Sequence, residues 1–83
     1  MQEEQLKEVI DILIQIENDF SIPKNIRFRI KNAISALEED QLSVGLRVNK
    51  SLQELDAFDE ESNIPSFTRT QIWHVVSSLE SIA

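Results

Sequence analysis

The sequence predicts an all-α protein, a four-helix up-and-down bundle, on three observations. The 83 residues contain one glycine and two prolines, so few residues interrupt a helix. Apolar residues recur at helical spacing in four successive segments. The second half of the chain also repeats the first at an offset of 42 residues, as a duplicated helical hairpin does. We therefore predict one domain over residues 1–83, with internal repeats at about 3–40 and 41–82.

The first predicted helix covers about residues 3–19 and has an unusually wide apolar stripe. Ile12 and Ile14 widen this stripe to roughly 200° of the helix surface. The helix then either lies at the centre of the bundle or has a second apolar face for self-association. The remaining members of the stripe are Leu6, Val9, Ile10, Leu13, Ile16 and Phe20.

A proline turn separates the first predicted helix from the second, which covers about residues 23–39. Ile22 precedes Pro23 and is therefore disfavoured in helical conformation, whereas Pro23 suits a first helical turn. The second helix has one narrow apolar stripe, and Phe28 lies opposite it between Arg27 and Arg29. Aromatic residues and arginines are enriched among interface anchors. The stripe consists of Ile26, Ile30, Ala33, Ile34 and Leu37.

The third and fourth predicted helices cover about residues 42–59 and 67–82. Asp40 is the predicted N-cap of the third helix. Phe67 stands at the entry of the fourth helix and Trp73 at the edge of its stripe, where each either seals the core or binds a partner. The two stripes consist of Val44, Val48, Leu52, Leu55 and Phe58, and of Ile72, Val75, Val76, Leu79 and Ile82.

Two arginines recur with the proline turns, because segment 22–27, Ile-Pro-Lys-Asn-Ile-Arg, corresponds to segment 64–69, Ile-Pro-Ser-Phe-Thr-Arg. We expect Arg27 and Arg69 to be structural. Each either donates to carbonyls at the end of the preceding helix or pairs with an acid, Asp19 or Glu61 respectively.

The two proline turns, with the run Thr-Arg-Thr-Gln-Ile-Trp at 68–73, are similar to a family of small archaeal proteins of unknown function. Members of that family are short and all-helical, so the resemblance implies a compact four-helix bundle. It implies no catalytic residue, ligand or partner. Residues 13–37 also resemble a HEAT-type hairpin, but two repeats fall short of the three that a solenoid normally needs. We therefore favour closure into a bundle.

Composition excludes several classes of function. A net charge of −7 disfavours nucleic acids and anionic membranes as partners. Cysteine is absent, and no segment has the length of a membrane span or the pattern of a signal peptide. The single histidine, His74, lies opposite its apolar stripe, so we expect neither a metal site nor another cofactor. We predict a soluble, cytoplasmic protein that is not an enzyme.

A basic cluster at the start of the second helix is the one local anomaly. Lys24, Arg27 and Lys31 share one side of a helix N-terminus, where backbone N–H groups attract anions. They either bind an anion or balance carboxylates such as Glu17 and Asp19. We predict a protein-interaction or accessory-subunit role, with homodimerisation as one form of it. Its predicted contact residues are Phe28, Arg29 and Trp73. The alternative is a nucleic-acid- or ribosome-associated factor that uses the basic cluster.

Overall fold

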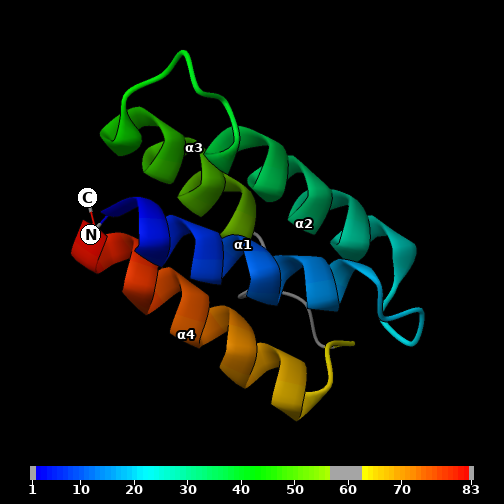
Figure 1. The fold of residues 1–83 in the computed structure, drawn as a ribbon. Helices are drawn as coiled ribbons and strands as arrows, with labels where there is room; N and C mark the ends of the chain where they lie inside the picture. The colour runs from blue at the N-terminus through cyan, green and yellow to red at the C-terminus, as the bar shows by residue number, and fades with distance from the viewer. Residues whose placement is uncertain (1, 57–62, 83) are drawn as a thin grey trace.

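Four helices make up the computed structural model, which describes residues 2–56 and 63–82. Neighbouring helices run antiparallel, so the predicted four-helix up-and-down bundle is confirmed (Figure 1). At the connections before and after the second helix, each helix end is one or two residues shorter than we had predicted. The helices are α1 (Gln2–Glu17), α2 (Lys24–Leu37), α3 (Val44–Asp56) and α4 (Ser66–Ile82).

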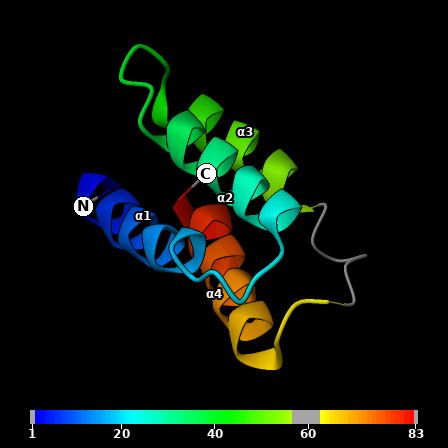
Figure 2. The same ribbon diagram turned by 90° about the vertical axis from the view of Figure 1, so that its right-hand side faces the viewer.

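The helices form a closed ring in which each packs against two neighbours. α1 lies between α2 and α4, and α3 also contacts both α2 and α4 (Figures 1 and 2). The packing of α1 on α4 closes the ring, which distinguishes this bundle from an open stack of hairpins. The most extensive pair is α2 with α3, which joins the two predicted repeats rather than lying within either. The 42-residue repeat itself stays a prediction.

The wide apolar stripe of α1 reflects its position between two helices. Leu13 and Ile16 are buried, whereas Ile10 and Ile12 are partly buried and pack against the rim of the core. Ile14 is 38% exposed and marks the outer limit of the stripe. Packing against α2 and α4 therefore covers most of the stripe and leaves Ile14 outside it. The predicted stripe of α2 is entirely buried.

Two local predictions were wrong. Phe20 is 82% exposed rather than part of the core, because α1 ends at Glu17 and the chain then turns. Asp40 does not cap α3, which begins after Ser43. The Leu46 N–H donates to the Ser43 hydroxyl over 3.3 Å, so Ser43 provides the side-chain cap. Phe58, Asp59 and Glu61, which entered our predictions, lie outside the described residues.

The connections α1–α2 and α2–α3 adopt the same turn. The Ile22 N–H donates to the Asp19 carbonyl and the Leu42 N–H to the Glu39 carbonyl, each over 3.1 Å. The two turns are 20 residues apart, a shorter spacing than the predicted 42. The sequence pattern conceals the second turn, because Ser43 stands where the first has Pro23. Among the described helices, none is long and apolar enough to cross a membrane.

Candidate functional site

The outward side of α2 is a positively charged surface with an aromatic residue at its centre. Phe28 is 62% exposed and lies opposite the buried residues of its helix. Lys24 and Lys31 lie one turn before and after it, and both are exposed. We call Lys24, Phe28 and Lys31 the α2 outer face. α2 contains four basic residues and no acidic one, in a protein whose net charge is −7.

Arg27 points into the α1–α2 turn and has a structural part there. Its Nε donates to the Ile22 carbonyl over 3.1 Å, and its guanidinium carbon lies 4.8 Å from the ring centroid of Phe20. Arg27 thus donates to a carbonyl, as one of the two expectations had it, but the acceptor lies in the turn and not at the end of α1. Anion binding by Lys24, Arg27 and Lys31 together stays a prediction. The Arg27 guanidinium is already in contact with the Ile22 carbonyl and the Phe20 ring.

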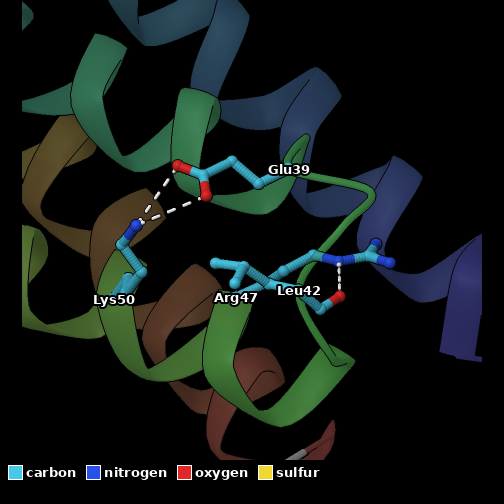
Figure 3. A network of polar contacts seen from close by, with 4 residues as sticks. All are labelled: Glu39, Leu42, Arg47 and Lys50. Carbon is cyan, nitrogen blue, oxygen red and sulfur yellow. Dashed lines mark hydrogen bonds and ion pairs between the residues drawn. The ribbon is translucent and has the colours of Figure 1, made fainter.

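Arg47, which was not among the predicted site residues, repeats this arrangement in the next turn. Its Nε donates to the Leu42 carbonyl over 2.9 Å (Figure 3). Its Nη1 lies 3.8 Å from the Glu3 carboxylate of α1, so Arg47 also connects α3 to α1. The signal that finds it is an apolar residue followed by arginine five positions later. That spacing occurs at Ile22 and Arg27, at Leu42 and Arg47, and at Ile64 and Arg69.

Asp19 organises the first turn through its carboxylate. Its Oδ1 accepts hydrogen bonds from the Ser21 hydroxyl at 2.6 Å and from the Ser21 N–H at 3.0 Å. These two bonds, with a smaller contribution from the positive charge of Arg27, lower the pKa of Asp19 below its ordinary value of 3.8. The carboxylate is exposed, so this is a local effect on the turn.

Replacing Ser21 by alanine is expected to raise the pKa of Asp19 toward 3.8, because the side-chain hydrogen bond is the largest cause of the shift. The folded-state pKa is depressed, so the stabilisation is present above the unfolded pKa and is lost as pH falls through the folded one. Carboxyl-carbon NMR titration of wild type and Ser21→Ala measures both values. An Asp19 pKa equal in the two proteins would contradict this assignment.

Arg29 belongs to the contact between α2 and α3 rather than to the α2 outer face. Its Nη1 lies 3.8 Å from Glu54 Oε1, and Asn32 Nδ2 donates to the same oxygen over 3.4 Å. Phe28 and Arg29 are neighbours in sequence, but successive helical residues point about 100° apart, so they serve different surfaces.

Trp73 lies on another part of the molecule. It is 60% exposed on α4, beside a hollow of about 60 Å³ that Leu55, Arg69 and Val76 also line. α2 and α4 lie on opposite sides of α1 in Figure 1 and do not pack extensively against each other. The structure therefore does not bring Phe28 and Trp73 together into one patch.

A groove of about 600 Å³ runs along α1 on the side of the α2–α3 turn. Its apolar lining residues are Leu6, Ile10, Ile14 and Leu37, and its charged ones are Glu3, Lys7, Asp11, Glu38, Asp40 and Arg47. We call it the α1 groove. Four carboxylates face two basic side chains, so its rim has a net negative charge. Leu6, Ile10 and Ile14 of this lining belong to the wide apolar stripe that the sequence predicted for the first helix.

A smaller hollow of about 250 Å³ lies between α1 and α4. Its lining includes Ile12, the 73% exposed Phe67 and His74, which is exposed as predicted. Within residues 2–56 and 63–82, no three His, Cys, Asp or Glu side chains are grouped so that they could hold a metal ion.

These features define a small all-α protein built as a closed four-helix bundle. The chain belongs to the Uncharacterised protein family UPF0147, whose model matches residues 1–82. The resemblance noted in the proline turns is thereby confirmed. UPF0147 proteins of Metallosphaera sedula and Aeropyrum pernix are 40% and 34% identical to it over 80 residues. In both cases this is 96% of this chain, and it is 90% and 88% of theirs.

A crystal structure has the same architecture. It is that of the unknown function protein MMP1188, with a TM-score of 0.92 and 38% sequence identity. The match covers 98% of this chain and 92% of that one. The closed bundle is thus shared with a solved structure.

Proposed function

We propose that this protein is not an enzyme but an interaction protein that binds a protein partner through the α2 outer face. The observation that supports this is the exposure of Phe28 between two lysines. Burying an exposed phenylalanine side chain contributes about 1.5–3 kcal/mol, which is enough for it to serve as an anchor. Phe20 is more exposed, at 82%, but it lies in the α1–α2 turn and its ring already contacts the Arg27 guanidinium.

The charges of the α2 outer face specify the partner further. Among residues 2–56 and 63–82, no carboxylate forms an ion pair with Lys24 or Lys31. Their charges are therefore available to an acidic surface that surrounds an apolar depression. Complementary charge mainly speeds association and excludes wrong partners, while the buried aromatic ring provides affinity.

Affinity capture from native lysate with the tagged full-length chain tests the proposal. We expect a stoichiometric protein partner that survives nuclease treatment and is lost with Phe28→Ala. Phe67→Ala is the matched control, because Phe67 is also an exposed phenylalanine but lies on α4. Retention of the same partner by Phe28→Ala, or loss with both variants, would contradict the role of the α2 outer face.

A nucleic-acid- or ribosome-associated role is the second candidate, supported by the same two lysines. Aromatic rings beside basic residues can stack on unpaired bases. This role requires binding that weakens steeply with salt, and the net charge of −7 opposes it. Partners that disappear on nuclease treatment would favour this candidate over a protein partner.

A further inference from the structure

We infer that the α2 outer face binds a second copy of this chain, whose α1 groove receives Phe28 together with Lys24 and Lys31. This inference rests on the proposed function, because it names the partner of the same surface. It also gives a function to the second apolar face that was one of the two alternatives for the first helix.

The floor of the α1 groove suits an aromatic side chain. Ile14 is 38% exposed and Ile10 is partly buried, so both offer apolar surface that the bundle does not cover. With a volume of about 600 Å³, the α1 groove is large enough to hold a phenyl ring and part of the helix that carries it.

The two surfaces carry opposite net charges, and most of their charged side chains form no ion pair within the described part of the chain. Asp11, Glu38 and Asp40 on the rim form no ion pair there, and neither do Lys24 and Lys31 on the α2 outer face. Glu3 is the one rim carboxylate in an ion pair, with Arg47. Docking would therefore place unpaired lysines beside unpaired carboxylates without breaking an existing contact.

The lengths of the two surfaces also agree. The α1 groove follows α1 from Glu3 to Ile14, a separation of 14 − 3 = 11 positions and about 16 Å at the rise of an α-helix. Lys24 and Lys31 are 31 − 24 = 7 residues apart, or about 10 Å. The α2 outer face thus fits within the groove with room at both ends.

The contact is heterologous, because the two surfaces differ and each chain carries one of each. This arrangement allows a complementation experiment with full-length chains. Phe28→Ala removes the anchor but leaves the α1 groove intact, whereas Ile14→Glu blocks the α1 groove but leaves the anchor intact. Both positions are exposed, and circular dichroism melts verify that each variant folds.

Sedimentation velocity from micromolar to millimolar concentration is the measurement. We expect wild type and the control Phe67→Ala to self-associate, and each single variant to sediment as a monomer. An equimolar mixture of Phe28→Ala with Ile14→Glu should form a one-to-one heterodimer. A wild type that stays monomeric throughout, or a mixture that stays monomeric, overturns the inference.

Charge reversal is the second test and does not depend on the behaviour of Ile14→Glu. Lys24→Glu with Lys31→Glu should abolish self-association. Mixing that variant with Asp11→Lys, Asp40→Lys should restore association, and failure of the restoration counts against the docking. If wild type is monomeric but capture from lysate still depends on Phe28, the inference is wrong and the proposed function stands. If capture is also independent of Phe28, both fail.

Discussion

Leu13→Ala is expected to lower the free energy of unfolding by about 2–5 kcal/mol, the range for a leucine removed from a packed core. Leu13 is fully buried in the middle of α1, the helix between α2 and α4. The loss combines the transfer energy of the removed methyl groups with the cavity that they leave. The free energy of unfolding of a typical domain is about 5–15 kcal/mol. A domain as small as this one lies toward the lower end of that range, so the variant loses a large share of its total stability.

Its matched control is the next residue along the chain. Ile14 is 38% exposed, so Ile14→Ala is expected to cost less than about 1.5 kcal/mol, because only part of its side chain leaves an apolar environment. Urea unfolding followed by far-UV circular dichroism measures both variants. An unchanged denaturant slope shows that stability rather than the compactness of either state has changed. Equal losses for the two variants would contradict the orientation of α1.

Arg47→Ala is expected to lower the free energy of unfolding by about 1–3 kcal/mol, the scale of a hydrogen bond made by a charged group. Arg47 donates to the Leu42 carbonyl over 2.9 Å within the α2–α3 turn. The substitution removes this hydrogen bond from the turn and also removes the ion pair with Glu3 of α1. The same measurement on Arg27→Ala should give a loss of the same order, since Arg27 makes the equivalent bond to Ile22.

Lys50→Ala is the control for removing a positive charge from the same helix. Lys50 lies one turn after Arg47, and its Nζ is 3.2 Å from Glu39 Oε1 (Figure 3). Both side chains are about half exposed, so this surface pair contributes about 0–1 kcal/mol. Thermal and urea unfolding should therefore rank Lys50→Ala well above Arg47→Ala in stability. Wild-type melting temperatures for both Arg27→Ala and Arg47→Ala would show that these arginine hydrogen bonds do not stabilise the turns.

The fold could be predicted because its evidence lies in local periodicity. Burial follows the apolar stripes of α2 and α4 closely, and the first proline turn was placed correctly. The prediction that Phe20 is part of the apolar stripe was wrong because the apolar spacing continues past Glu17. The helix ends at Glu17, and the Asp19–Ser21 turn follows. Spacing alone carries no information on where such a turn begins.

The surfaces were harder to predict because they combine distant segments. The α1 groove needs α1 and the α2–α3 turn side by side, which no linear pattern reveals. Arg47 was not predicted because the turn before it has serine in place of proline. Its five-residue spacing from Leu42 is nevertheless the same as that of Arg27 from Ile22. Phe28 was recognisable as an outward residue, because its neighbours define the buried side of one short helix.

The packing of α1 against α4 has a consequence for folding during synthesis. α1 is synthesised before α2 and α3, and α4, one of its two helix partners, is synthesised after them. The pair of α2 and α3 is close in sequence and most extensive, so we expect it to form early. The side of α1 that faces α4 must then wait until α4 is synthesised, and the nascent chain exposes that apolar side until α4 packs against it.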